Sequence, residues 1–133
     1  MKKEILIVSI ILIVIIIINI ICQKHLSNSI KDINMQLEEI SDIFRNNYSD
    51  KSFDDNSINN KIKSVSKKWD EYEKRLSLYI EHDELEKVDR VIVLIRSNIE
   101  CRNYEKVESD LKECIFILNH IKNKQTFDIS NLF

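Results

Sequence analysis

The feature that most constrains this chain is an almost unbroken apolar run over residues 5–21, directly behind Met-Lys-Lys-Glu. As a helix rising 1.5 Å per residue, the run reaches roughly 26 Å, close to the ~30 Å hydrocarbon thickness of a bilayer. Isoleucine and valine favour strands in water, but a lone strand in lipid leaves its amides unpaired, so the run is expected to be helical. Residues 1–22 are therefore predicted to form a transmembrane signal anchor.

A cleaved secretory signal is the main alternative, because Lys2 and Lys3 also make a positively charged leader. Such signals have an apolar core of about 7–15 residues and end at small residues of the Ala-x-Ala type. This run is longer, and the chain contains no alanine, so an uncleaved anchor is favoured. The two lysines predict a single pass of the cell membrane, with a cytoplasmic N-terminus and residues 23–133 outside.

The composition excludes several kinds of site. The chain has no glycine, so phosphate-cradling loops and nucleophile elbows are absent in their usual form, and helices cannot end on a left-handed glycine. A net charge of −2 with interleaved signs gives no basic surface for nucleic acid. The three cysteines, Cys22, Cys101 and Cys114, have no metal-binding or redox spacing. We expect no cofactor and no metal, and we expect the protein not to be an enzyme.

Beyond the apolar run, hydrophobic residues recur at alternating spacings of three and four, which predicts helices throughout. The first stripe is Leu26, Ile30, Ile33, Leu37, Ile40 and Phe44. Because nothing between the run and Leu26 breaks a helix, one rod is expected to extend to about residue 46, with a break near residue 24 as the alternative. The stripe is typical of coiled coils, and its use in a bundle core is favoured over a self-association seam that would make a homo-oligomer.

The fold class predicted is all-α, with an N-terminal transmembrane helix followed by an antiparallel three- or four-helix bundle over residues 23–133. A segment rich in Asn, Asp and Ser predicts a loop at about 46–57, capped by Asp54, Asp55 or Ser57. Further turns are expected at about 81–83, where Asp83 and Glu86 would form a capping box, and at about 101–103.

Two regions are candidates for interactions. Trp69, the only tryptophan, falls on the stripe of the second helix, where core packing is favoured over ligand stacking. His82 and Glu86 have the spacing of a metal pair, but one histidine among scattered carboxylates favours a helix start over a metal site. The chain ends in an apolar tail, whose residues Phe127, Ile129, Leu132 and Phe133 are expected to dock in a groove.

Several short motifs together resemble an uncharacterised bacterial family, domain of unknown function 4363, found mainly in clostridia and their relatives. They are Trp69, His82-Asp83-Glu84-Leu85, Asn103-Tyr104, His120-Ile121 and the terminal Asn131-Leu132-Phe133. The resemblance covers nearly the whole chain and implies a small membrane-anchored helical protein. It also implies a partner, a YetF-like multi-spanning membrane protein encoded by neighbouring genes, and it supplies no catalytic residue.

The leading functional prediction is a non-enzymatic interaction module that is anchored in the bilayer and binds another bacterial envelope protein. The candidate interaction residues are Trp69, His82, Asp83, Asn131 and Phe133. The alternative is an extracytoplasmic ligand- or metal-sensing module that uses the region of Trp69 and His82.

Overall fold

Over residues 1–47 and 54–130, the chain forms four helices that run alternately up and down. The computed structural model describes the backbone of residues 1–47 and 54–130 and the side chains of residues 1–46 and 54–125. The helices are α1 (Lys2–Asn47), α2 (Asp55–Leu76), α3 (His82–Glu100) and α4 (Tyr104–Ser130). The prediction of an all-α fold with a long apolar first helix and a helical bundle is confirmed.

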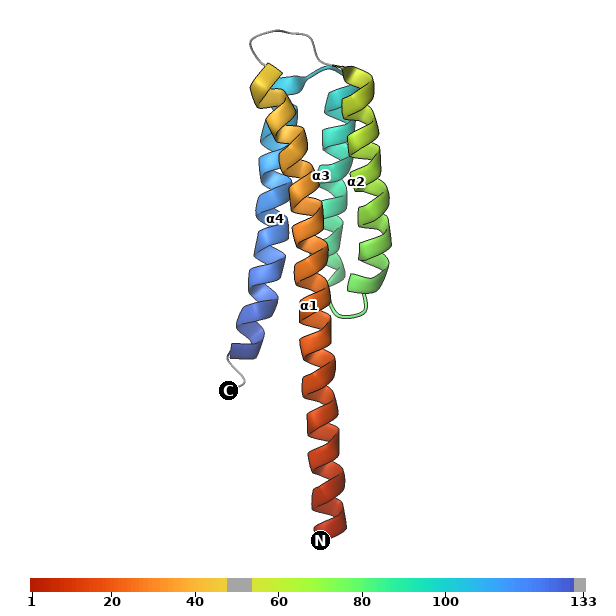
Figure 1. Cartoon of the computed structure of the whole chain (residues 1–133), viewed down its shortest axis with the longest axis vertical. Helices are drawn as coiled ribbons and strands as arrows, with labels where there is room; N and C mark the ends of the chain where they lie inside the picture. Colours follow the sequence, from red (N-terminus) through yellow and green to blue (C-terminus); the bar gives the residue numbers. More distant parts are fainter. Residues whose placement is uncertain (48–53, 131–133) are drawn as a thin grey trace.

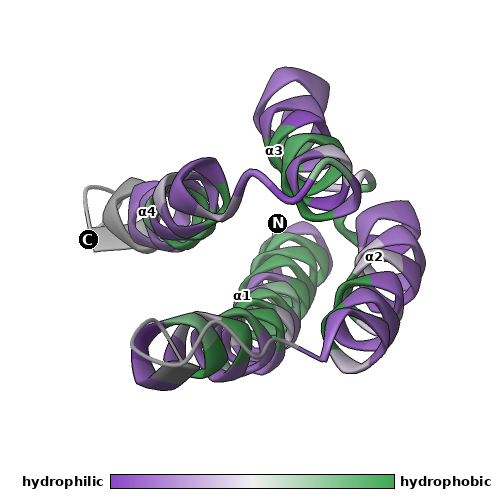
Figure 2. Ribbon diagram, turned by 90° about the horizontal axis from the view of Figure 1, so that it is seen from above, coloured by the Kyte–Doolittle hydropathy of each residue, from purple (hydrophilic) through white to green (hydrophobic). Residues whose placement is uncertain are grey.

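The four helices form a closed ring, which Figure 2 shows from above. Helix α1 packs against α2 and α4, and α3 packs against the same two helices. The interior is filled by the predicted stripes, whose residues include Leu26, Ile33, Phe44, Ile62, Trp69, Leu85, Ile95, Leu111 and Leu118. Burying a large aliphatic side chain of this kind stabilises a fold by roughly 1.5–3 kcal/mol, so the stripes account for the antiparallel packing.

Helix α1 is one continuous rod of 46 residues, about 69 Å long, as predicted. Its second half belongs to the bundle, and its first half projects beyond the other three helices (Figure 1). In that projecting half the large aliphatic side chains are exposed over 42% (Ile16) to 65% (Ile5) of their surface. Among the described residues, α1 is the one helix long and apolar enough to be a membrane span or a signal anchor.

The connection between α2 and α3 differs from the prediction. Helix α2 ends at Leu76 and α3 begins at His82, so the turn precedes the predicted position at about 81–83. Glu81 occupies the N-cap without a side-chain hydrogen bond, and Asp83 lies inside the first helical turn, so the predicted capping box is wrong. The Leu76 carbonyl accepts hydrogen bonds from the amides of Tyr79 (3.0 Å) and Ile80 (2.8 Å) in a last turn whose Ile80 is buried. The Glu81 carbonyl then accepts the first hydrogen bond of α3 from the Leu85 amide (3.4 Å), so α3 has already begun when the chain reaches Asp83.

The other two connections agree with the prediction where they are described. The Asp54 side chain caps α2 by accepting a hydrogen bond from the Asn56 amide at 3.2 Å. Residues 48–53 of the predicted loop lie outside the described residues. The predicted turn at about 101–103 separates α3 from α4, and the Asn103 carbonyl accepts the first hydrogen bond of α4 from the Val107 amide at 3.2 Å.

The end of α3 shows how a chain without glycine closes a helix. Arg102 adopts a φ of 55°, the left-handed conformation that glycine normally fills. The amide of Asn103 bonds to the Asn98 carbonyl at 2.8 Å, and the amide of Arg102 bonds to the Ile99 carbonyl at 3.0 Å. This is the hydrogen-bond pattern of a Schellman motif, with an arginine at its strained position.

Because a side chain in the left-handed conformation costs about 1 kcal/mol, we expect Arg102→Gly to be more stable than Arg102→Ala by about that amount. Alanine is the matched control, since both variants lose the ion pair of Arg102 with Asp55 (2.9 Å), and only glycine relieves the strain. Thermal unfolding of the full chain in detergent, followed by circular dichroism, measures the difference. Equal stability of the two variants would contradict the assigned backbone conformation.

Candidate functional site

Of the predicted interaction residues, the structure describes Trp69, His82 and Asp83, and it does not bring these three together in one site. Trp69 is buried, with 1% of its surface exposed, and its indole N–H donates a hydrogen bond to the Asp89 carboxylate of α3. His82 and Asp83 are exposed at the start of α3. Asn131 and Phe133 lie outside the described residues, as do the side chains of Phe127, Ile129 and Leu132.

A hollow of about 280 Å³ opens beside Trp69, between α2 and α3. Three carboxylates line it, Asp70 and Glu73 from α2 and Asp89 from α3, and Arg96 of α3 lines it as well. Desolvation by burial, followed by the negative charge of Asp89, raises the pKa of Glu73. His82 is not among the residues that line this hollow, although its charge acts on Glu73 in the opposite direction. The hollow therefore combines three carboxylates and one arginine beside a buried indole, and it is not a tryptophan–histidine site.

A second polar cluster joins α1 to α2 around Asp32. Its carboxylate accepts hydrogen bonds from the Tyr72 hydroxyl (2.6 Å), the Lys68 ammonium (3.1 Å) and the Gln36 amide (3.2 Å). The hydrogen bond from Tyr72, supported by Lys68 and partly opposed by burial, holds the pKa of Asp32 below its ordinary value of 3.8. The same bond, together with burial, raises the pKa of Tyr72 to about 12. The ionised Asp32 carboxylate therefore links α1 to α2.

The third site is at the base of the bundle, which we define as the level of Gln23, Tyr79 and Gln125. Here α2 and α3 have already turned back, while α1 continues downward beside the lower end of α4 (Figure 1). The Gln23 side chain donates a hydrogen bond to the Gln125 carbonyl at 3.2 Å, which ties α1 to α4. The open end of the core is therefore framed by α1, α4 and the turn between α2 and α3.

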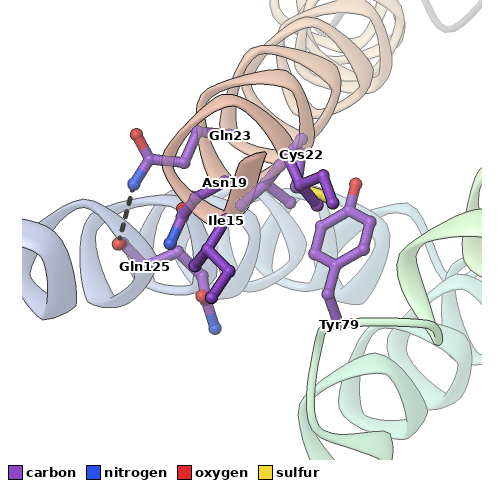
Figure 3. Close-up of a pocket in the computed structure, with 8 residues that line it drawn as sticks. Ile15, Asn19, Cys22, Gln23, Tyr79 and Gln125 are labelled. Atoms are coloured by element: carbon purple, nitrogen blue, oxygen red, sulfur yellow. Dashed lines mark hydrogen bonds between the residues drawn. The ribbon is translucent and has the colours of Figure 1, made fainter. Parts of the chain in front are cut away.

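A hollow of about 320 Å³ occupies this open end (Figure 3). It is lined by Ile15, Ile18, Asn19, Cys22, Gln23, Leu26, Tyr79 and Gln125. The lining residues of α1 lie on the same face of the helix that is buried higher in the bundle. Because α2 and α3 do not extend to this level, the hollow is bounded by α1, α4 and the turn between α2 and α3. From the bundle towards the apolar run, the lining of the hollow changes from amide and hydroxyl groups to isoleucine side chains.

Tyr79 stands at the edge of this hollow, in the turn between α2 and α3. Its hydroxyl lies 3.0 Å from His25 Nδ1 of α1, which fixes the turn against the first helix. Burial, followed by interaction with Cys22, raises the pKa of the Tyr79 hydroxyl to about 12. The Tyr79 hydroxyl therefore stays protonated even well above neutral pH. It can donate or accept a hydrogen bond without placing a charge beside the apolar run.

The chemistry available at these sites is hydrogen bonding and packing. Within the described residues, no group of three or more His, Cys, Asp or Glu side chains could hold a metal ion. Cys114 is buried in the core, where burial raises the pKa of its thiol to about 12. Cys101 is exposed and Cys22 is half-buried, and all three cysteines are free.

Sequence reasoning did not identify Asp32, Asp89 or Tyr79 as pairing residues. Asp32 and Asp89 flank apolar stripes, at positions that border a neighbouring helix. An acidic residue at such a position is a sequence signal for a polar contact between two helices. The contact of Tyr79 with His25 depends on where the chain turns between α2 and α3. The position of that turn depends on the packing of Ile80 in the core, which the sequence pattern does not show.

These features define a class of protein, a four-helix bundle built on an extended apolar first helix. A comparison with family models matches residues 20–132 to the family described as "Domain of unknown function (DUF4363)". The chain belongs to that family, in agreement with the resemblance seen in its motifs. No curated protein and no solved structure matches the chain.

The Asp32 cluster predicts how stability depends on pH. A carboxylate whose pKa is lowered by folding stabilises the fold above its unfolded pKa, and that stability is lost as the pH falls through the folded pKa. We expect Asp32→Asn to lower stability by about 1 kcal/mol at pH 7 and to flatten its decline below about pH 4. Melting temperatures of the full chain in detergent across a pH series measure both effects.

Two further variants make this test specific. Glu38→Gln removes an exposed carboxylate from the same helix and should leave the acid dependence unchanged. Tyr72→Phe removes the hydrogen bond while keeping the Asp32 charge. It should also reduce, without abolishing, the loss of stability as the pH rises from 10 towards 12, because Tyr79 contributes to the same loss. An unaltered acid profile in Asp32→Asn would show that this carboxylate does not couple folding to protons.

Proposed function

We propose that the protein is a non-enzymatic interaction module, anchored in the cell membrane by the first half of α1, that presents its bundle to another membrane protein. The observation that carries this proposal is the unbroken passage of α1 from an apolar rod into the bundle core. A rigid joint of this kind holds the bundle at a fixed height and tilt over the bilayer. A protein held by a flexible tether would not need a continuous helix between the membrane and the bundle.

The polar clusters stabilise the bundle itself. Asp32, Tyr72 and the Trp69 indole are occupied by partners within the bundle, where they link neighbouring helices. The outer surface carries exposed apolar residues, including Phe116 of α4 at 71% exposure and Leu94 of α3. The resemblance described above implies a YetF-like multi-spanning protein as the partner, and a second copy of the chain is the alternative.

Site-specific photocrosslinking in native membranes tests this proposal. We expect a photoreactive residue at Phe116 or Leu94 to give one reproducible adduct with a membrane protein. The matched control is the same residue at Glu71, which is exposed on α2. Adducts at none of the exposed positions of α3 and α4, or the same adducts at Glu71, would reject a specific partner-binding surface.

The proposed topology places the bundle outside the cytoplasm. Cys101 is exposed in the turn between α3 and α4, whereas Cys114 is buried, so a membrane-impermeant maleimide should label Cys101 in intact cells without unfolding. Cys101→Ser should remove that labelling. If Cys101 is labelled only after lysis, the bundle faces the cytoplasm and the orientation is reversed.

A second candidate function, ligand sensing, is favoured by one observation, the hollow beside Trp69 with its three carboxylates. A divalent cation bound between Glu73 and Asp89 would change the fluorescence of Trp69. Titration of the full chain with calcium, magnesium and zinc tests this, with Asp89→Asn as the variant and His82→Ala as the control outside the hollow. Fluorescence that does not respond to any of these cations would remove this candidate.

A further inference from the structure

The hollow of about 280 Å³ between α2 and α3 carries charges of both signs. Asp70, Glu73 and Asp89 give it three carboxylates, and Arg96 gives it one guanidinium group. Val93, which also lines the hollow, is 60% exposed, so the hollow opens to solvent. A ligand dissolved in water can therefore reach these charges.

The charges are ordered along the groove between the two helices. Helices α2 and α3 run in opposite directions, and the negative charge of Asp89 acts on Glu73 across the seam, so these two carboxylates lie at one end of the hollow. Seven residues away on each helix, at a distance of about 10 Å, are Ser66 of α2 and Arg96 of α3. The hollow therefore has an acidic end and an end with a guanidinium and a hydroxyl group.

The protein itself neutralises neither end of the hollow. Among the described residues, the Arg96 guanidinium forms no hydrogen bond or ion pair, and no lysine or arginine forms an ion pair with Glu73 or Asp89. The Trp69 indole N–H donates a hydrogen bond to Asp89, which leaves the negative charge of that carboxylate in place. Opposite charges without counter-ions thus stand at the two ends of one cavity.

The wall between the two ends is apolar. It is lined by Trp69 of α2 and by Ile92 and Val93 of α3, which lie between the charged positions in the sequence of each helix. Trp69 and Ile92 are buried in the core, so their packing fixes the shape of the wall. A divalent cation would use only the acidic end. An α-amino acid has both charged groups on one carbon atom, so it is too short to reach both ends.

We propose that the hollow between α2 and α3 binds a linear organic zwitterion, a molecule with an ammonium group and a carboxylate at opposite ends of a short aliphatic chain. Its ammonium group lies between Glu73 and Asp89, its carboxylate pairs with Arg96, and its chain lies against Trp69 and Val93. The site goes beyond the divalent-cation candidate, because it uses the charges at both ends of the hollow. It does not depend on membrane anchorage.

Isothermal titration calorimetry of the full chain in a neutral detergent tests this site, with ε-aminocaproate as the probe. Hexylamine and hexanoate are the control ligands, because each carries one of the two charges on a chain of the same length. We expect ε-aminocaproate to bind roughly tenfold more tightly than either control, since each end of the hollow adds a charge-assisted hydrogen bond. The fluorescence of Trp69, the only tryptophan, should change over the same concentration range, which locates the probe in the hollow.

Two variants assign the charges of the ligand to the two ends. Glu73→Gln should weaken the binding of both ε-aminocaproate and hexylamine roughly tenfold. Arg96→Gln should weaken ε-aminocaproate to the level of hexylamine and should not weaken hexylamine. The matched controls are Glu71→Gln and Arg75→Gln, which remove the same charges from exposed positions of α2 outside the hollow and should keep the parental affinities.

Three results would overturn the site. They are binding of ε-aminocaproate no tighter than that of hexylamine, an equal loss of affinity in the control variants, and the absence of both binding heat and a fluorescence change. Circular dichroism of each variant verifies that the bundle is intact. A fluorescence response to calcium, magnesium or zinc without binding of ε-aminocaproate would reject the zwitterion site and keep the cation candidate, so the two failures are distinguishable.

Discussion

The structure depends on one constraint, that a single uninterrupted helix presents two different surfaces. Below about residue 22, α1 is apolar on every side, and above it only the stripe from Leu26 to Phe44 is apolar. No proline, glycine or bulge separates these parts, so the direction of the stripe is fixed relative to the apolar half. The other three helices must assemble on that stripe, and this determines where the base of the bundle lies.

Packing of stripes alone would tolerate several helix registers, and polar contacts at the seams select one. Tyr72 bonds to Asp32 between α1 and α2, and the Trp69 indole bonds to Asp89 between α2 and α3. The α3–α4 seam has Asn98 bonded to Asp110 at 2.6 Å, and the α1–α4 seam has Asn34 bonded to Asn119 at 3.0 Å. Each seam therefore has a directional bond that a shift of one turn would break.

The same arrangement links fold to function. Because α2 and α3 turn back earlier than α4, the core opens at the base between α1 and α4 instead of ending in a closed cap. The opening meets the apolar half of α1, so the hollow at the base of the bundle lies at the boundary of the proposed membrane span. Anchorage and partner binding would both act through the orientation of one rigid rod.

The sequence by itself determined the helices, the continuity of α1 and nearly all of the core, because hydrophobic spacing reports directly which face of a helix leaves water. It also determined that Trp69 would be packed inside, since that residue falls on a stripe. Tertiary structure decided the ring order, the early turn before His82, the left-handed Arg102 and the pairing of Asp32 with Tyr72. These features depend on contacts between residues distant in sequence, such as Tyr79 with His25 and Gln125 with Gln23, and the periodicity of one segment carries no information about its neighbour's register.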